Sequence, residues 1–452
     1  MSNYNSKLAN GSDAIVPSSY ELQEAILTSS NGTEYNIVDL VASLSIEESL
    51  YSGSLQGEVS ILDAAQMLEK VKCVSGEGLH VVLKRRLNNG QQDKYSHKFR
   101  IAEIHSYAKL SPGTATYVFR VVSEHAYISQ SKTISKPFSD VTGKLIKNIC
   151  TDELSIDEKN LSINTETKQT IVGVYPRMRP MYLINWLVRR SYDNGTPFFF
   201  YETLGDGIHF NSFENIVNKE SYREYKYAPN VNTIVGSEEN NKLLARKILT
   251  LSSEFNMSQY MNLGAGAYSS TLHTIDIATK SYDTQTYSYS ESKLRLNANG
   301  VLPKGSQIQE RPLDEHRDST NFYISLNSQA VSGGSSYQAP ANSDILAANA
   351  YIQNMDSLEL NVEIFGDFNL SVGMTIDINI VKSVDAGDTK RGKDLFLSGK
   401  YIVSSIVHDF KDEYRMKLLL KKDSFIESLD NIQERDITRC RYIRVSLSTS
   451  PR

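Results

Sequence analysis

The stretch MYLINWLVRRSYDNGTPFFFYETLGDGIHF, residues 181–210, carries the most distinctive pattern in this sequence. A proline precedes it, and proline is tolerated in the first turn of a helix, so residues 181–190 are predicted to be helical. Asn194-Gly195 ends this helix, because the dipeptide favours a tight turn. The aromatic run 197–201 then predicts a buried strand, and Asp206-Gly207 predicts a turn into the next strand. A helix followed by an aromatic hairpin predicts a compact α+β module.

Regions rich in predicted strands lie on both sides of this module. Residues 38–46 and 55–62 alternate apolar and polar side chains, which is typical of strands with one packed face. Asp63 follows them as the N-cap of a short helix over 64–71. The other predicted strands are 79–83, 99–107, 115–128, 248–251, 271–278, 358–364, 374–381, 401–410 and 414–420, and the other predicted helices are 139–150 and 343–354.

The two strand-rich regions resemble each other weakly in the order of their elements. Residues 38–64 are matched with 245–278. In both regions a helix then precedes a glycine, a large apolar residue and an alternating strand, at Gly78 and at Gly373. Any two antiparallel sheets share the alternation, but here the order of elements agrees as well. A repeated β-domain is therefore favoured over chance.

Length and composition bound the architecture and the class of protein. At roughly 150 residues per domain, 452 residues predict about three domains. The formal net charge of −5 argues against non-specific wrapping of nucleic acid, which needs clustered positive charge, but it allows a channel through which DNA passes. The distant cysteines Cys73, Cys150 and Cys440 predict reduced thiols in a protein folded in cytoplasm. The polar N-terminus and the lack of long apolar stretches predict a chain without signal peptide or membrane segment.

No pattern in the sequence predicts catalysis, a cofactor or a metal. The glycine-rich residues 264–267 lack the lysine and hydroxyl residue of a phosphate-binding loop. No H-E-x-x-H motif or cysteine–histidine cluster is present, and histidines such as His125 are expected to be structural residues in strands. The acidic pairs Glu47-Glu48 and Glu238-Glu239 and the charge run 314–318 are expected to be solvated. No catalytic, cofactor-binding or metal-binding residue is predicted.

The stretch 181–210 resembles the helix, turn and aromatic hairpin of phage baseplate central hub proteins, late-control D proteins and the N-terminal half of type VI secretion VgrG spikes. The flanks agree with this resemblance. FNLSVGMTIDINI, residues 368–380, resembles the family's glycine-then-strand element, and GKYIVSSIVHDFKDEYRMKLLLKKD, residues 399–423, resembles its closing hairpin. The resemblance covers roughly residues 30–425 and rests on module order and hydrophobic pattern.

The resemblance implies a mainly β fold with α+β modules. Two tube-like antiparallel β-domains would form an internal pseudo-repeat, accompanied by a helix–hairpin α+β domain and an insertion. The expected bounds are a flexible arm at 1–20, the first tube-like domain at 21–130, the α+β domain at 131–235, the second tube-like domain at 236–284 and 346–424, the insertion at 285–345 and a C-terminal tail at 425–452.

The function that the resemblance implies is structural and not enzymatic. Three copies would form a baseplate central hub that joins the sixfold tail tube to the threefold central spike and leaves a channel for DNA. The implied partners are two further copies, the tail tube protein, the central spike protein and other baseplate proteins, with DNA only in transit, no cofactor and no membrane segment. The implied location is the tail baseplate of a virion assembled in the host cytoplasm. The family positions expected to serve assembly are Trp186, Phe198, Phe199, Phe200, Tyr201, Gly207, Gly373 and His408.

The chain departs from the spike-fused members of this family. No glycine-rich β-helix or oligonucleotide-fold spike follows residue 425, which implies that the spike is a separate protein. Two other functions stay open at this point. One is a peptidoglycan or glycan hydrolase on a β scaffold, and the other is a host-surface binding module, which the tyrosine and serine content favours. The 26 tyrosines also predict rings at subunit interfaces.

Overall fold

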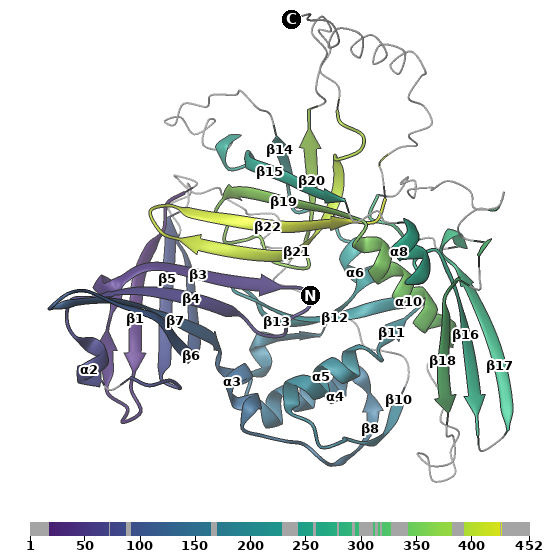
Figure 1. The fold of residues 1–452 in the computed structure, drawn as a ribbon, viewed down its shortest axis with the longest axis horizontal. Helices are drawn as coiled ribbons and strands as arrows, with labels where there is room; N and C mark the ends of the chain where they lie inside the picture. The colour runs from purple at the N-terminus through teal and green to yellow at the C-terminus, as the bar shows by residue number, and fades with distance from the viewer. Residues whose placement is uncertain are drawn as a thin grey trace, which may run out of the picture.

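A large sheet of thirteen strands runs through the described part of the computed structural model (Figure 1). The structure describes residues 18–71, 73–86, 92–163, 170–227, 243–255, 259–277, 280–291, 294–297, 311, 315–316, 319–326, 342–381, 393–424 and 426. Most of the predicted arm, the pair Glu238-Glu239, much of the charge run 314–318, Cys440 and nearly all of the predicted tail lie outside these residues.

The first half of the large sheet has the strand order β3-β4-β7-β6-β5-β1-β2. Its strands alternate as predicted, so that Leu44 and Ile46 of β3 are buried while Glu47 is exposed. Asp63 caps α2, since its Oδ2 accepts from the backbone N of Met67 at 2.7 Å. The elements are β1 (Glu21–Thr28), β2 (Glu34–Asn36), β3 (Val41–Ser49), β4 (Gln56–Asp63), α2 (Met67–Val71), β5 (Gly78–Arg86), β6 (Gln92–Ser111) and β7 (Thr114–Ser123).

The second half repeats this strand order as β15-β19-β22-β21-β20-β14. The strands that occupy equivalent places are β3 and β15, β4 and β19, β7 and β22, β6 and β21, β5 and β20, and β1 and β14. The elements are β14 (Glu224–Tyr227), β15 (Ile248–Phe255), β19 (Leu358–Phe365), β20 (Thr375–Ile380), β21 (Gly399–Phe410) and β22 (Tyr414–Lys422).

Strand β21 joins the two halves into one sheet. On one side it pairs with β22 along most of its length. On its other side residues 399–402 pair with β20, and residues 405–410 pair with β3 of the first half. The two halves therefore share hydrogen bonds at the β21–β3 pair and do not merely pack against each other.

The α+β module lies below this junction in Figure 1 and contains the predicted helix and aromatic hairpin. Two expectations were wrong at its start. The strand predicted over 115–128 ends at Ser123, and the helix α3 follows, so His125 is helical. Residues 139–141 pair with β10 as part of a strand, so the helix predicted from 139 begins at Thr142. The elements are α3 (Glu124–Gln130), β8 (Pro137–Val141), α4 (Thr142–Asn148), β9 (Leu161–Ile163), β10 (Thr170–Val174), α5 (Pro180–Val188), β11 (Tyr192–Asp193), β12 (Thr196–Thr203), β13 (Gly207–Ser212) and α6 (Phe213–Val217).

Between β15 and β19 the chain forms a separate three-stranded sheet in the order β17-β16-β18. The sequence repeat matched the strand at 271–278 with β4, and this pairing was wrong: β16 belongs to the small sheet, whereas β19 takes the place of β4. Local alternation is the same in both strands, so only the pairing distinguishes them. The elements are α8 (Gln259–Gly264), β16 (Ser269–Asp276), β17 (Ser281–Ser288), β18 (Asn321–Leu326) and α10 (Asn342–Met355).

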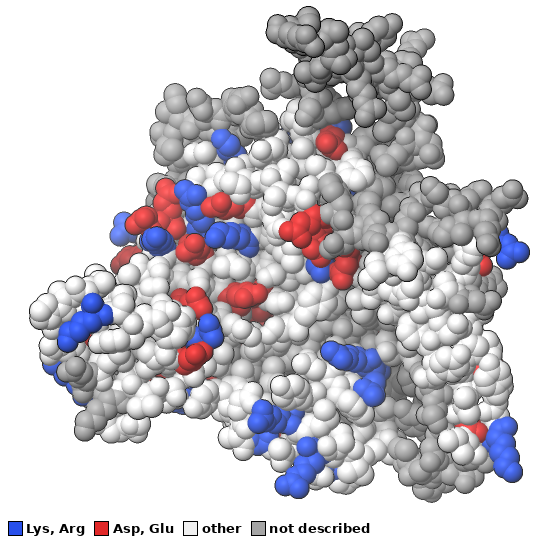
Figure 2. Space-filling model, viewed as in Figure 1, with Lys and Arg blue, Asp and Glu red and all other residues white. Residues whose placement is uncertain are grey.

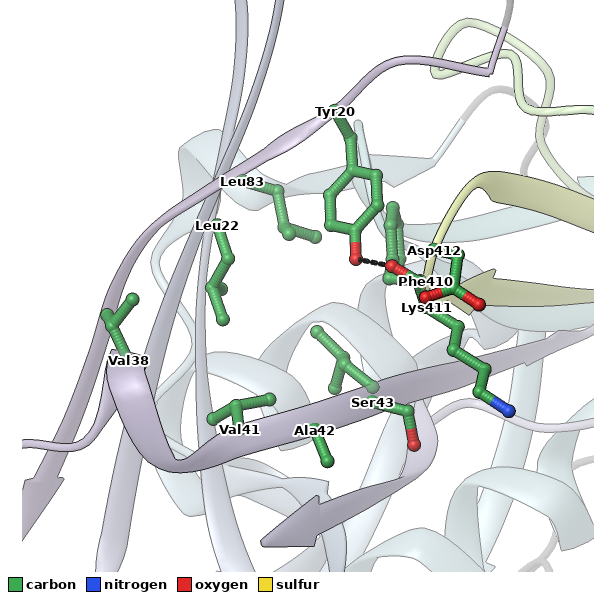
Figure 3. A pocket seen from close by; sticks show the side chains of 11 residues that line it. Tyr20, Leu22, Val38, Val41, Ala42, Ser43, Leu83, Phe410, Lys411 and Asp412 are labelled. Atoms are coloured by element: carbon green, nitrogen blue, oxygen red, sulfur yellow. Dashed lines mark hydrogen bonds between the residues drawn. The ribbon is translucent and has the colours of Figure 1, made fainter. Parts of the chain in front are cut away.

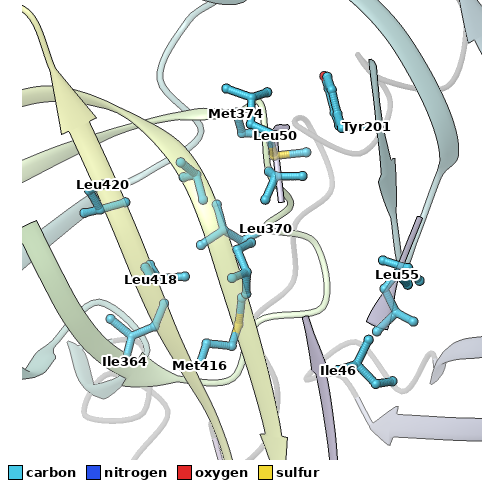
Figure 4. Close-up of a cluster of buried hydrophobic side chains, with 14 of the residues drawn as sticks. Ile46, Leu50, Leu55, Tyr201, Ile364, Leu370, Met374, Met416, Leu418 and Leu420 are labelled. Atoms are coloured by element: carbon cyan, nitrogen blue, oxygen red, sulfur yellow. The ribbon is translucent and has the colours of Figure 1, made fainter. Parts of the chain in front are cut away.

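One hydrophobic core crosses the junction of the two halves. Figure 4 shows one cluster that contains Ile46 and Leu55 of the first half and Leu370 and Met416 of the second, with Tyr201 of the module near Leu50 and Met374. The predicted mainly β fold with α+β modules is confirmed, while the exact domain bounds remain predictions.

Candidate assembly site at the junction of the sheet halves

Strand β12 separates two hydrophobic cores. All eight of its residues are buried, and successive side chains of a strand point to opposite sides. Phe198 and Phe200 pack in the core of the α+β module, where Phe198 stacks on Phe210 with a centroid distance of 4.7 Å. Phe199 and Tyr201 pack in the core of the large sheet. The aromatic run therefore fastens the module to both sheet halves.

Two of the predicted site glycines allow backbone to approach closely. Gly373 has a φ of +75°, and a Cβ there would lie 2.4 Å from the hydroxyl oxygen of Tyr201. This brings the loop before β20 against β12. Gly207 has a φ of +80°, and a Cβ there would lie 2.4 Å from the carbonyl oxygen of Asn160. Gly207 thus tightens the β12–β13 turn and lies away from the junction.

Glu48 connects all three parts of the molecule although its side chain is only 1% exposed. Its Oε1 accepts from the backbone N of Leu204 in the module at 2.7 Å, and its Oε2 accepts from the backbone N of Val372 in the second half at 3.2 Å. The expectation that Glu47-Glu48 is a solvated pair is therefore wrong for Glu48. A buried carboxylate needs such donors, because desolvation otherwise penalises its charge.

His408 completes this polar group on the second half. Its Nε2 lies 3.2 Å from Oε1 of Glu48, and its Nδ1 lies 2.8 Å from the hydroxyl oxygen of Tyr414. Since His408 is 2% exposed and pairs with Ile46 across β21 and β3, it joins the two halves at their shared strand pair. This is a structural role inside one chain.

A second buried carboxylate, Glu202 of β12, reaches in the opposite direction into the first half. Its Oε2 accepts from the backbone N of Leu55 at 2.8 Å and from the hydroxyl of Ser123 at 2.5 Å. Nε2 of His97 lies 3.7 Å from Oε1, and Nε2 of His125 lies 3.7 Å from Oε2. Burial lowers the pKa of His97, so this ring tends to be neutral, and the carboxylate serves chiefly as an acceptor.

A third polar contact joins the first half to the loop after β19. Asp367 lies 4.0 Å from Arg85 of β5 and 3.3 Å from Arg223, measured between carboxylate oxygens and guanidinium nitrogens. The hydroxyl of Tyr95 donates to the backbone oxygen of Phe368 at 2.5 Å. The junction is therefore held by charge and hydrogen bonds at three separate points as well as by apolar packing.

Trp186 lies apart from the other predicted site residues. It is partly buried at the edge of the module core, edge-on to Phe138, with the Arg190 guanidinium 4.1 Å above its ring. The structure thus brings Phe199, Tyr201, Gly373 and His408 to the junction, places Phe198 and Phe200 on the reverse side of β12, and leaves Trp186 and Gly207 elsewhere. An assembly role of these eight residues remains a prediction.

The junction residues Glu48, Glu202 and Asp367 were not predicted from the sequence. For Glu48 a signal was present, because residues 44, 46 and 48 share one face of β3 and the first two are apolar. Glu202 lies in a run whose other members are aromatic or small, which also indicated burial. Asp367 follows a strand in a loop, and nothing local distinguishes it from a solvated aspartate.

The outer face of the large sheet carries charges of both signs. Figure 2 shows Lys, Arg, Asp and Glu side chains gathered over β3, β4, β21 and β22. Arg120 of β7 bridges Glu103 at 2.8 Å and Glu58 at 3.4 Å, and Arg415 of β22 bridges Glu363 at 3.1 Å. Acidic and basic groups are thus interleaved across both halves rather than separated.

A hollow of about 320 Å³ lies where the start of the described chain crosses from β1 to the β21–β22 turn (Figure 3). Leu22, Val41 and Phe410 line it with apolar surface, and Tyr20 donates from its hydroxyl to the backbone oxygen of Lys411 at 2.5 Å. The charged residues among those that line it are Lys411 and Asp412, in the β21–β22 turn.

No group of three or more His, Cys, Asp or Glu residues in the described part of the chain has a geometry that could hold a metal ion. No helix among the described residues is both long and apolar enough to span a membrane. Cys73 and Cys150 are free thiols.

The fold of this chain is similar to that of a known prophage tail protein. The 43 kDa tail protein of prophage MuSo2 from Shewanella oneidensis matches with a TM-score of 0.50 and 11% identity, over 90% of this chain and 100% of that chain. The tail protein from Neisseria meningitidis MC58 matches with a TM-score of 0.49 and 9% identity, over 89% of this chain and 97% of that chain.

A third similar structure is that of the E. coli c3393 protein, which is described as a component of the type VI secretion system. It matches with a TM-score of 0.44 and 8% identity, over 90% of this chain and 77% of that chain. No protein-family model and no curated protein matches the sequence. At 11% identity the match to the MuSo2 tail protein shows the fold alone, so the function is argued from the geometry of this chain.

Proposed function

We propose that the chain is a structural component of the tail of a phage or of a related contractile injection machine. Within that class, three copies form the central hub of the baseplate, between a sixfold tail tube and a threefold central spike, around a channel through which DNA passes. Its partners are two further copies, the tail tube protein, the spike protein and other baseplate proteins. It acts without catalysis, in a virion baseplate assembled in the host cytoplasm.

The observation that carries this proposal is the repeated strand order of the two sheet halves, joined at β21 and β3. A chain with two like units gives, in three copies, six units in a ring. Such a ring presents near-sixfold symmetry to one neighbour and threefold symmetry to another, which an adapter between a tube and a spike requires.

The polar contacts at the junction support a mechanical role. Glu48, Glu202 and Asp367 each connect two or more parts of the chain by buried bonds to backbone or to arginine. These bonds hold the halves in one orientation, because breaking any of them leaves a buried charge or amide unsatisfied. A hub that transmits force between tube and spike needs halves that do not rotate against each other.

The charges on the outer face of the large sheet are consistent with the proposal that DNA passes through a channel. Its charges alternate in sign around Arg120 and Arg415, so it offers no continuous positive surface to a DNA backbone. DNA that passes such a face is not retained, which suits a conduit.

The test is the mass and shape of the purified full-length chain, alone and with its cognate tail tube and spike proteins. Light scattering should give three times the chain mass of 50.7 kDa, and negative-stain images should show a threefold ring with a central hole. A monomer at every concentration, also in the presence of tube and spike proteins, would overturn the proposal.

A matched pair of variants locates the contact between copies. Leu110, 63% exposed near the end of the long strand β6, is an apolar side chain without cover in one chain, so Leu110→Asp should shift the mass towards the monomer. Tyr182→Ser, at a 57% exposed site on α5, is the control for loss of exposed apolar surface in general. Equal effects of both variants would show that β6 is not the contact.

A further inference from the structure

The small sheet β17-β16-β18 has an exposed face with aromatic rings. It stands beside α10 and apart from the large sheet at the right of Figure 1. The pairing puts His273 of β16 opposite Thr284 of β17 and Tyr323 of β18, and puts Ile275 opposite Tyr282. Tyr282 is 63% exposed and Tyr323 is 69% exposed, so these rings face solvent.

The rings of Tyr282, His273 and Tyr323, called the ring platform below, are nearly parallel. The planes of His273 and Tyr282 differ by 16° with centroids 5.8 Å apart, and those of His273 and Tyr323 differ by 17° with centroids 4.8 Å apart. The hydroxyl oxygen of Tyr282 lies 2.5 Å from Nδ1 of His273. Because this hydrogen bond joins the hydroxyl tip of Tyr282 to the edge of the His273 ring, and the two centroids are 5.8 Å apart, these two rings lie edge to edge, close to one common plane.

Hydrogen bonds fix the central ring of the platform. Nε2 of His273 lies 3.0 Å from Oδ1 of Asn321, so both ring nitrogens of His273 have partners on neighbouring strands. A ring held at both ends loses little further freedom when a ligand stacks on it, which favours binding. The platform is therefore rigid before anything binds.

The chemistry of this face is neutral and polar around the rings. Thr284, Thr286 and Asn321 are exposed on the same side of the sheet. The described side chains on this side of the three strands include no Asp, Glu, Lys or Arg. A strongly charged polymer would have no oppositely charged side chain to pair with on this face. A flat ligand with hydroxyl groups could stack its apolar face on the rings and form hydrogen bonds with the threonine and asparagine oxygens around them.

We propose that the ring platform binds a neutral polysaccharide of hexose or N-acetylhexosamine units. The C–H face of a sugar ring stacks on an aromatic ring, and its equatorial hydroxyls reach the threonine and asparagine side chains beside it. Tyr323 stacks on His273 with centroids 4.8 Å apart, so the rings open to a sugar are the exposed Tyr282 and Tyr323. Adjacent strands lie about 4.8 Å apart, and these two rings, on the strands at either side of β16, can stack on two separate sugar units of one chain. This goes beyond the proposed hub role, which requires no ligand on this sheet.

A protein partner fits this face less well. Stable protein contacts bury about 800 Å² on each side around an apolar core. Here the only aliphatic side chain described between the rings is Ile275, which is 42% exposed, and the two tyrosines already have hydroxyl-bearing tips suited to water. A small, flat and wet ligand matches the face better than a second protein surface.

The experiment is affinity electrophoresis of the full-length protein in native gels that each contain one soluble neutral polysaccharide: a β-glucan, a mannan, a galactan or glycol chitin. At least one should retard the wild-type protein in proportion to its concentration. Tyr323→Ala should weaken that retardation at least tenfold, because it removes a stacking ring. Tyr282→Phe should weaken it less, because the ring remains and only its bond to His273 is lost.

Tyr260→Ala is the matched control, since Tyr260 is an 87% exposed tyrosine on α8, outside the platform. It should migrate like the wild-type protein in every gel. The proposal is overturned if no polysaccharide retards the wild-type protein, or if Tyr323→Ala is retarded as strongly as Tyr260→Ala. It is also overturned if Tyr323→Ala changes the mass in light scattering but not the retardation, since the face would then be a contact between copies.

Discussion

The two halves of the large sheet share a strand order but differ in their sixth strand and in one connection. In the first half β1 runs antiparallel to β5, whereas in the second half β14 runs parallel to β20. The chain passes from β3 to β4 within residues 50–55, but between β15 and β19 it adds α8, the small sheet and α10. The strand order is therefore repeated, whereas the direction of the sixth strand and the length of a connection vary between the halves.

The outer faces of the halves also share a charge arrangement. Arg120 of β7 reaches Glu58 of β4, and Arg415 of β22 reaches Glu363 of β19, on strands that occupy equivalent places. The core side lacks this symmetry, because Glu48 of the first half accepts donors from the second half and from the module. The two halves thus have similar ion pairs on their exposed faces, whereas the buried carboxylate of Glu48 at the junction belongs to the first half alone.

Removal of the buried carboxylate at the junction should have the largest effect on stability. Glu48→Ala leaves the backbone amides of Leu204 and Val372 and the ring of His408 without their acceptor. We expect the free energy of unfolding to fall by about 3–5 kcal/mol, the usual effect of removing one partner from a buried polar cluster. Urea unfolding followed by circular dichroism measures this loss.

The control for Glu48→Ala is its exposed neighbour. Glu47→Ala removes the same side chain from the outer face of β3 and should change the free energy of unfolding by less than about 0.5 kcal/mol. If the two variants lose the same stability, Glu48 does not hold the halves together and the described junction is not the asymmetric element of the molecule.

The sequence predicted the elements whose signals are local. The aromatic run of β12, the helix α10 and the β21–β22 hairpin lie close to their predicted bounds, because propensity and periodicity determine them. The place of β16 in a separate sheet could not be predicted, since two alternating strands differ only in the partner they find. Asp367 was missed for the same reason, because its arginine partners come from distant parts of the chain.

Lys422 offers a pH-dependent comparison with an exposed lysine of the same strand. Its ammonium group is buried and donates to the backbone oxygens of Phe396 and Ser398 at 2.7 and 2.9 Å, and burial lowers its pKa to about 7. An unfolded lysine titrates near 10.4. Between pH 7 and about 10 the unfolded chain therefore binds the proton that the folded chain lacks, and stability rises with pH.

The difference in unfolding free energy between the wild-type protein and Lys422→Met should thus grow in favour of the wild type from pH 7 to pH 9. The slope has an upper limit of about 1.4 kcal/mol per pH unit. Lys417→Met, at an exposed position of β22, is the control for the loss of a lysine from this strand. A flat difference for Lys422→Met would mean that Lys422 stays protonated in the folded protein.

The smallest effects are expected at the paired arginines of the outer face, and they test the likeness of the halves most directly. Arg120→Gln and Arg415→Gln each remove a half-exposed guanidinium that pairs with two glutamates, so each should lower the free energy of unfolding by about 0.5 kcal/mol. Because salt screens exposed charges, both losses should shrink together in 1 M salt, where the Debye length is about 3 Å. Unfolding curves of the two variants at low and high salt measure this. Equal losses support equivalent faces in the two halves, whereas a loss confined to one variant would show that the shared strand order does not extend to shared surface energetics.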